Sequence, residues 1–387
     1  MKISIIHSFY RASSPSGENV AVVLQAQALE NAGHDVQLIS RNSDDFMGQR
    51  LYPLFSGIRV ATGAGVNPNR ALDAFQPDIV HIHNLFPNWS TNWLKNQKTP
   101  VVATVHNFRP VCAAGTLLRN GVFCDLCPTA GSHHAVKHSC YRDSAVASIP
   151  LAIASRKKKP TPLLERADKV LFLASRTQEI FRTYGRGYEE KSLVLPNFAK
   201  DPEESVAGKK SNEAKSWIFV GRLSPEKGVL PLIQNWPSDV SLEIVGSGTQ
   251  ESLARDAAVG KQVIFHGQRD KADVESLMRS ARGLIFPSMC AESAASLVYL
   301  EALAMGLPTI SLFETAVSDD IEEFGTGISI CSLDELSHAI DQINADYDRY
   351  SRAARQGYTE RYSEAKWLIS MEKVYRDLHE FGRRENS

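Results

Sequence analysis

Two cationic side chains in the second half of the sequence are spaced to bind a diphosphate. Residues 217–220 predict a buried strand, and Gly221 directly after it lets the backbone turn, so that Arg222 projects from the strand end. Lys227 then falls in the first turn of the next predicted helix. Two cations that converge on one strand end predict an anion-binding site.

A second segment, residues 293–308, predicts a loop of small residues that leads into an apolar helix. The helix is expected to end at Gly306 and is followed by Pro308. The first N–H groups of a helix have no partner within the helix and carry partial positive charge, which favours phosphate. The expected main-chain donors are those of Ala295, Ser296 and Leu297.

These residues resemble the retaining glycosyltransferases of family 4, which have the GT-B fold, and the resemblance runs the length of the chain. It implies that Arg222 and Lys227, within G-R-L-x-x-x-K-G, bind the diphosphate of a nucleotide sugar. Glu301, the first residue of an E-A-L-A-x-G-x-P pattern, would hold the nucleotide ribose. Sugar transfer with retained anomeric configuration is then expected in a cleft between an acceptor domain and a donor domain.

The family pairs the ribose-binding glutamate with another, eight residues earlier, that contacts the donor sugar. Counting back from Glu301 leads to Ser293, whereas the nearest carboxylate is Glu292, nine residues away. Eight residues turn a helix by about 80° and nine by about 180°, so Glu292 could not share a face with Glu301 if both were helical. We therefore expect Glu292 to lie in the preceding loop and assign the sugar contact to it.

Gly246 and Gly248 follow a predicted strand at residues 242–245 and precede a helical pattern at 250–257. A dinucleotide fingerprint would need a third glycine, which is replaced here by Glu251, and an acidic residue after the next strand. An NAD site is therefore not expected. Two interpretations stay open, a loop that borders the donor site, as in the family, and a plain strand–helix turn.

In the first half, four residues at predicted strand ends are candidates for the sugar or the acceptor. By resemblance, the His106–Asn107 dipeptide after the strand at 101–106 lies beside the reacting sugar, with His106 as a hydrogen-bonding residue in contact with it. Gly17 and Glu18, after the first strand, match a loop near the acceptor. His81 and His83 share a strand face; a structural role is expected for His81, and His83 stays open.

A polar insertion at about residues 107–143 contains four cysteines. Cys112, Cys124, Cys127 and Cys140 give the spacing C-x11-C-x2-C-x12-C. Thiols clustered in this way in a cytosolic protein favour a structural Zn²⁺ site over disulfides. A redox or iron–sulfur role and plain reduced cysteines are the alternatives, and some family members carry a similar insertion.

The spacing of the apolar runs predicts an α/β chain with two doubly wound parallel sheets. We expect an acceptor-binding domain at residues 1–197, a polar linker at 198–216, and a donor domain at 217–362. The last segment, 363–387, predicts an amphipathic helix that returns to the first domain, as in GT-B proteins, with a core-facing helix of the second domain as the alternative.

Charge and hydropathy limit the classes of partner that are expected. The 387 residues carry a formal net charge of −1, so no nucleic-acid partner is expected. No apolar stretch of 18 residues and no signal peptide are found, which predicts a cytoplasmic protein. The basic run at residues 156–159, after the apolar run at 146–154, has two open interpretations: peripheral contact with anionic lipid head groups, and a solvated helix end, which is the commoner meaning of such a run.

The expected donor is a UDP- or GDP-sugar, and the expected acceptor is a glycan or a lipid-linked glycan of cell-surface polysaccharide assembly, by resemblance. No D-x-D motif follows any predicted strand, so no catalytic metal is expected. The competing hypothesis is a nucleotide-sugar sensor or scaffold without catalysis. Other GT-B chemistries, a phosphorylase or an epimerase, are also considered because fold alone does not fix function. They are less favoured, and a phosphorylase would need a cofactor lysine or a phosphate site that is not found in the sequence.

Overall fold

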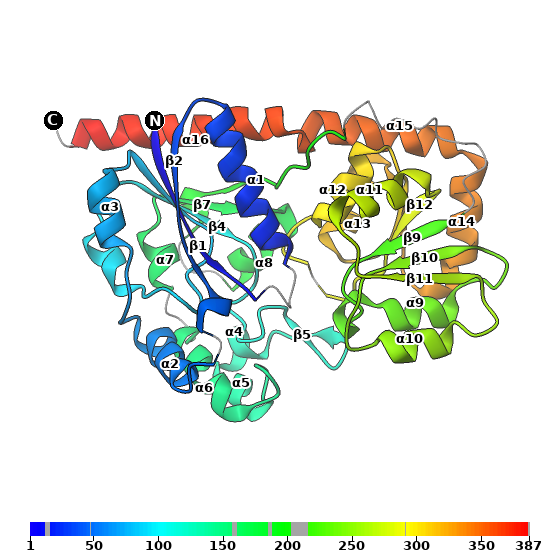
Figure 1. Ribbon diagram of the computed structural model, residues 1–387, viewed down its shortest axis with the longest axis horizontal. Coiled ribbons are helices and arrows are strands. Elements are labelled where there is room, and N and C mark those ends of the chain that lie inside the picture. The colour runs from blue at the N-terminus through cyan, green and yellow to red at the C-terminus, as the bar shows by residue number, and fades with distance from the viewer. Residues whose placement is uncertain are drawn as a thin grey trace. The chain divides into compact units, whose positions relative to one another are not determined.

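The computed structural model describes residues 1–11, 16–46, 48–156, 161–184, 188–202, 216–290 and 292–385. The chain divides into two compact units. Unit 1 comprises Met1–Arg119, Cys124–Pro196 and Trp367–Ser387, and unit 2 comprises Asn120–Phe123 and Asn197–Lys366. Each unit is built around its own parallel sheet (Figure 1).

Within its described residues, unit 1 has a six-stranded parallel sheet in the order β2-β1-β3-β4-β7-β8. The central strands are buried on both faces, as expected for a parallel sheet covered by helices. The strands are β1 (Lys2–Phe9), β2 (Asp35–Asn42), β3 (Ile79–Ile82), β4 (Val101–Val105), β7 (Lys169–Phe172) and β8 (Ser192–Val194).

Helices cover this sheet and build the segments between its strands (Figure 1). They are α1 (Gly17–Asn31), α2 (Tyr52–Thr62), α3 (Asn69–Phe75), α4 (Leu126–Ala130), α5 (His133–Lys137), α6 (Ala145–Ala154), α7 (Pro162–Arg166) and α8 (Ser175–Thr183). The insertion also holds the short strands β5 (Leu118–Arg119) and β6 (Val122–Phe123).

The last helix, α16 (Glu364–Glu385), supplies an apolar stripe to unit 1. The stripe follows helical spacing, because its buried residues recur every three or four positions. Its members are Trp367, Met371, Val374, Tyr375 and Leu378. A polar contact adds to this packing, since His34 Nε2 lies 3.2 Å from Glu372 Oε1. Residues from Trp367 onward thus belong to the first unit.

Unit 2 repeats the design with the order β11-β10-β9-β12-β13-β14 among its described strands. The strands are β9 (Trp217–Val220), β10 (Leu242–Val245), β11 (Val263–Gly267), β12 (Gly283–Phe286), β13 (Thr309–Leu312) and β14 (Gly327–Ile330). The helices are α9 (Val229–Asn235), α10 (Glu251–Ala257), α11 (Lys271–Ser280), α12 (Leu297–Ala304), α13 (Ala316–Phe324), α14 (Leu336–Ala345) and α15 (Tyr347–Gly357).

The predicted fold class, two doubly wound parallel sheets, is confirmed. Strand β14 was not predicted, because its four residues alternate Gly and Ser with Ile and carry a weak apolar signal. Most of the expected linker at 198–216 lies outside the described residues, which stop at 202 and resume at 216. The division between the units falls at Pro196–Asn197.

Both sheets have a switch point where the chain changes direction across the sheet. In unit 1 it lies between β1 and β3, and in unit 2 between β9 and β12. Ligands of doubly wound proteins bind beyond the carboxyl ends of the strands at such a point. The loops that follow these strands therefore define where a site is expected in each unit.

Candidate active site

In unit 2, the loop after β9 carries Arg222 and Lys227. Lys227 lies in a 3-10 turn, Pro225–Lys227, and not in the first turn of α9 as predicted. The difference arises at Gly228, whose φ of +69° separates this turn from α9. A Cβ atom on Gly228 would lie 2.1 Å from the carbonyl oxygen of Pro287, so this glycine lets the loops after β9 and β12 touch.

The loop after β12 carries Glu292, and its carboxylate meets Lys227. Lys227 Nζ lies 2.6 Å from Glu292 Oε1, and Ser288 Oγ also donates to that oxygen. Burial alone would raise the pKa of Glu292, but the charge and hydrogen bond of Lys227 outweigh it and hold the pKa below its usual value. The same pairing raises the pKa of Lys227 despite burial. Both side chains are therefore ionised at neutral pH.

Arg222 is held differently. Its Nη2 lies 3.0 Å from Glu226 Oε1, but 48% of the Arg222 side chain is exposed. Exposed pairs of this kind contribute little and are screened by salt. The guanidinium is therefore available to a ligand at small cost.

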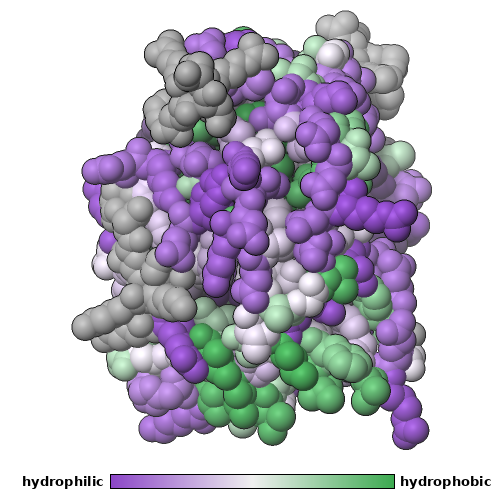
Figure 2. Space-filling view, turned by 90° about the vertical axis from the view of Figure 1, so that its left-hand side faces the viewer, coloured by the Kyte–Doolittle hydropathy of each residue, from purple (hydrophilic) through white to green (hydrophobic). Residues whose placement is uncertain are grey.

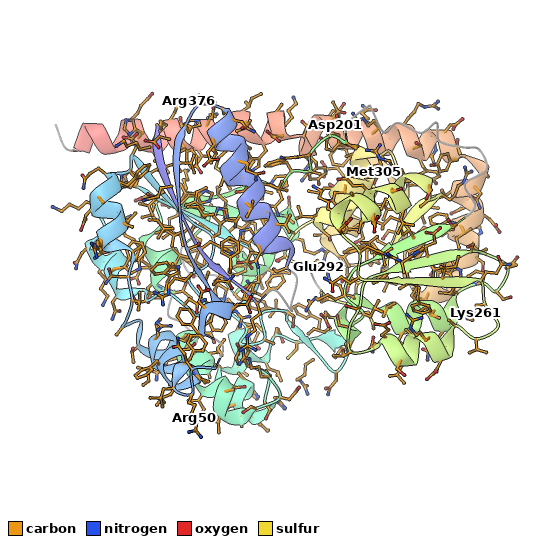
Figure 3. All side chains as sticks on the ribbon, viewed as in Figure 1. Arg50, Asp201, Lys261, Glu292, Met305 and Arg376 are labelled. Carbon is orange, nitrogen blue, oxygen red and sulfur yellow. The ribbon has the colours of Figure 1, made fainter. Side chains whose placement is uncertain are left out.

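Helix α12 begins at Leu297, after Ser296, which makes no side-chain cap hydrogen bond. Glu292 lies in the loop before this helix, as predicted, and Ser293 lies there too. Figure 3 labels Glu292 at this position. Glu301 lies within α12, and burial raises its pKa to about 6, with Lys271 lowering it and Glu275 raising it. Ala295 is buried just before the helix.

The loop after β10 packs directly on the loop that holds Arg222. Cβ atoms would lie 1.9 Å from Gly221 O if placed on Gly246 and 2.4 Å from Leu223 O if placed on Gly248. Leu223 N donates to Ser247 O at 2.9 Å. Both glycines thus permit close backbone contact and help to fix the Arg222 loop.

In unit 1, His83 follows β3 and His106 follows β4. His83 Nδ1 and His106 Nε2 lie 2.9 Å apart and share one hydrogen bond. Burial lowers the pKa of His106 to about 3 and the pKa of His83 well below its usual value. Both rings are therefore neutral at pH 7, so they offer hydrogen bonds and no charge.

His81 takes the structural role expected for it. Its Nδ1 lies 2.7 Å from the Tyr375 hydroxyl, and its Nε2 lies 2.8 Å from Thr104 Oγ1. Both ring nitrogens are thereby satisfied within the core. This histidine ties α16 to the strands that carry His83 and His106.

Glu18 lies in the first turn of α1, next to Gly17, the first residue of the helix. Asn107 Nδ2 donates to Glu18 Oε2 at 3.3 Å, so the structure brings two predicted residues together. Burial raises the pKa of Glu18 to about 7, while the Arg109 charge and the Asn107 and Asn84 amides lower it. This carboxyl therefore changes charge near neutral pH.

A cavity of about 670 Å³ opens beside these residues in unit 1. His83, His106 and Asn107 line it at the strand ends, and residues of α2, α6 and α7 form apolar walls. Its cationic lining residues are Arg59, Lys95, Arg109 and Arg166. Volume and lining are suited to an organic ligand.

Asn84 and Arg109 lie at this site and were not predicted from the sequence. Asn84 lines the cavity, and its Nδ2 donates to the Tyr10 hydroxyl at 2.9 Å. A signal was present, because His83–Asn84 repeats after β3 the His–Asn dipeptide that follows β4. Arg109 carried no such signal, since its position depends on the fold of the insertion.

The four cysteines of the insertion are all free thiols. Cys112 and Cys127 are buried, and burial, together with the three neighbouring thiols, raises the pKa of Cys127 to about 12. Among the described residues, however, no group of three or more histidine, cysteine or acidic side chains is arranged to hold a metal ion. The arrangement as it stands does not support the predicted zinc site.

Of the predicted basic run, Arg156 is exposed, and residues 157–159 lie outside the described part of the chain. No described helix is both long and apolar enough to span a bilayer.

Two family models match the chain. Residues 15–200 match "Glycosyltransferase Family 4", and residues 200–360 match "Glycosyl transferases group 1". Among similar sequences, a glycogen synthase of Mycobacterium tuberculosis is 24% identical, over 78% of this chain and 69% of its own length. A phosphatidyl-myo-inositol mannosyltransferase of Mycolicibacterium smegmatis is 23% identical, over 87% of this chain and 85% of its own.

Solved structures share the fold at lower identity. A sucrose-phosphate synthase from Thermosynechococcus elongatus superimposes with a TM-score of 0.68 at 17% identity, covering 97% of this chain and 98% of its own. HepE from Anabaena, solved in complex with UDP and glucose, gives 0.60 at 15% identity, covering 97% and 100%. With one glycosyltransferase model matching each half and GT-B enzymes as its structural neighbours, the chain belongs to the glycosyltransferases of the GT-B fold.

Proposed function

We propose that this glycosyltransferase moves a sugar from a nucleotide-diphosphate sugar to a glycan or lipid-linked acceptor, with retention of configuration. The arrangement in unit 2 carries the proposal. Lys227 and Arg222 follow β9, and the start of α12 follows β12, the neighbouring strand at the switch point. Cations and helix N–H groups there would stabilise the charge that develops on the departing diphosphate. Such a site needs no catalytic metal.

Each remaining residue has a role under this proposal. Glu301 accepts two hydrogen bonds from the nucleotide ribose, and Glu292 contacts the donor sugar. Gly246 and Gly248 keep the donor loop in place. In unit 1, His106 and Asn107 hydrogen-bond the sugar or the acceptor, with Gly17 and Glu18 beside them. The solved complexes of HepE with UDP and with UDP-glucose favour a uridine or similar nucleotide.

Nucleotide binding is the first test. Calorimetric titration of UDP, GDP, ADP and dTDP into the purified protein should show one nucleotide that binds at micromolar strength. Arg222→Ala and Glu301→Ala should both lose that binding. If no nucleotide binds, the donor site is wrong. If one binds but the enzyme neither hydrolyses its sugar conjugate slowly nor transfers the sugar, the sensor or scaffold hypothesis replaces catalysis.

The outer face of α2 and α6 supports a lipid-borne acceptor and peripheral membrane contact. The two helices pack together, since a Cβ on Gly57 would lie 3.2 Å from the Pro150 ring. Apolar side chains gather at the lower end of the face drawn in Figure 2. The exposed ones on or beside these helices are Leu51, Leu54, Phe55, Ile58, Val146 and Ile149.

Charge at this face agrees with an anionic lipid surface. Neither α2 nor α6 contains Asp or Glu, and exposed Arg50 and Arg156 flank them. Exposed apolar side chains with basic neighbours are typical of interfacial binding. The same two helices line the cavity on their inner side.

Phosphatidylglycerol vesicles should sediment the protein with them, and the double variant Phe55→Ser, Val146→Ser should stay in the supernatant. Equal binding to neutral vesicles would contradict the charge argument.

We also propose that the four cysteines of the insertion bind a structural zinc ion and that this insertion marks a subgroup of the family. Elemental analysis of protein purified without added chelator tests it directly. One zinc per chain would support it, and less than a tenth would leave four reduced thiols.

A further inference from the structure

The ion pair between Lys227 and Glu292 sits where the proposed function places the donor diphosphate. Its two partners are 65 residues apart in sequence and 2.6 Å apart in space. The side chains are 24% and 15% exposed. Glu292 has a φ of +27°, in the left-handed region that a residue with a side chain rarely adopts. The backbone is thus held in an unfavourable conformation at the residue that meets Lys227.

The two loops are fixed to each other by main-chain contacts as well. Met289 N donates to Glu226 O at 2.9 Å, and Ser288 Oγ lies 3.3 Å from the same carbonyl oxygen. The missing side chain of Gly228 permits this approach. Lys227 and Glu292 therefore face each other because the loops are docked, and the pair does not depend on two flexible side chains meeting in solvent.

A diphosphate and Glu292 would compete for the same ammonium group. Both are anions, and in a partly buried site like charges a few ångströms apart repel strongly. Unpairing a buried ion pair costs free energy unless another charge replaces the lost partner. An arriving diphosphate supplies that replacement, which leaves the Glu292 carboxylate free to accept hydrogen bonds from a hydroxyl.

We propose that the Glu292 carboxylate pairs with the Lys227 ammonium group when the donor is absent, in the place that the donor diphosphate takes. When the donor binds, the carboxylate moves to a sugar hydroxyl. This inference rests on the proposed donor site. Glu292 is thus both a competitor for the donor and, after the exchange, a ligand for its sugar. The Arg222–Glu226 pair has no such function, because the Arg222 side chain is 48% exposed and pairs exposed to this degree are weak.

The exchange predicts opposite effects of one substitution on binding and on turnover. Glu292→Gln removes the competing charge but keeps the side-chain volume and Ser288 contact. UDP and GDP are each titrated, and the dissociation constant of the nucleotide that binds wild-type protein should fall by roughly tenfold in the variant. In contrast, kcat with the sugar nucleotide should fall. The affinity for inorganic pyrophosphate should rise in the same way as that for the nucleotide. The affinity for uridine or guanosine, which lack the diphosphate, should stay the same.

Glu226→Gln is the matched control, because it neutralises the exposed pair on the same loop, and it should change nucleotide affinity less than threefold. The melting temperature of each variant, with and without nucleotide, monitors folding. Glu292→Gln should melt lower than wild type when empty and show a larger nucleotide-induced rise. Weaker nucleotide binding by Glu292→Gln would overturn the exchange and leave a structural ion pair. Absence of binding to wild-type protein would instead overturn the proposed donor site.

Discussion

Lys227 and Glu292 in unit 2 meet as an ion pair, whereas His83 and His106 in unit 1 meet as two neutral rings, although all four lie beyond strand ends at the edge of a parallel sheet. Burial opposes charge in both places. In unit 2 the opposite charge overrides it, and in unit 1 burial, with a smaller contribution from neighbouring histidines, lowers the pKa of each histidine. A local partner, and not depth alone, decides whether a buried group is charged.

This difference matches the two tasks of the proposed reaction. A leaving diphosphate needs fixed positive charge, whereas a sugar or acceptor hydroxyl needs hydrogen-bond partners without charge. Substitutions in one unit should therefore affect one task and leave the other unchanged.

Lys227→Ala should have the largest effect. It removes the cation aimed at the diphosphate and leaves Glu292 buried without its partner, so kcat/KM for the sugar nucleotide should fall by about 10³-fold. Steady-state kinetics measure this, and Lys366→Ala, on an exposed lysine, serves as the control. A loss smaller than tenfold would show that Lys227 does not bind the leaving group.

His106→Ala should lower kcat by about 10²-fold and leave the affinity for the free nucleotide unchanged, because the neutral ring contributes no charge to donor binding. His338→Ala, on an exposed histidine of α14, is the control for loss of an imidazole. If His106→Ala also abolished nucleotide binding, the separation of tasks between the units would be wrong.

The donor affinity should depend on pH through Glu301. Burial raises its pKa to about 6 in the folded protein, so the carboxylate that accepts from the ribose is lost as the pH falls below about 6. Nucleotide affinity should therefore decrease by about tenfold between pH 7 and pH 5. Calorimetry across this range measures it. In Glu301→Gln the inflection near pH 6 should disappear, and its persistence would assign it to another group.

Tyr375→Phe should have the smallest effect. It deletes the hydroxyl that bonds His81 Nδ1 and leaves that nitrogen unpaired in the core, so the free energy of unfolding should fall by about 1–3 kcal/mol. Urea denaturation measures the change. Arg376→Ala, at the adjacent exposed residue labelled in Figure 3, should cost under about 0.5 kcal/mol. Equal effects of both substitutions would mean that the His81 contact contributes nothing measurable.

The sequence was most informative where a local pattern carries the information. The strand at residues 217–220 and the following Gly221–Arg222 could be placed because an apolar run, a glycine and a cation are adjacent. The apolar stripe of α16 was readable from its helical spacing, and all five of its residues are buried. Such features depend on neighbours along the chain.

Other features depend on loops that meet only after folding. The irregular spacing of Glu292 placed it in a loop, but its pairing with Lys227 across 65 residues left no local trace. The Asn107–Glu18 contact likewise joins the residues after β4 to the first turn of α1, the helix that follows β1. Lys227 was expected in a helix because the left-handed turn at Gly228 cannot be distinguished in sequence from an ordinary helix start.

The path of α16 has a consequence for the order of events during synthesis. Tyr375 bonds His81 of β3, and the stripe from Trp367 to Leu378 fills unit 1. When residues 1–196 have been synthesised, the helix that completes their core has therefore not yet been made. Unit 2, encoded between the two pieces, is complete in sequence before unit 1 is. The core of unit 1 is therefore completed only after the residues of α16 have been synthesised.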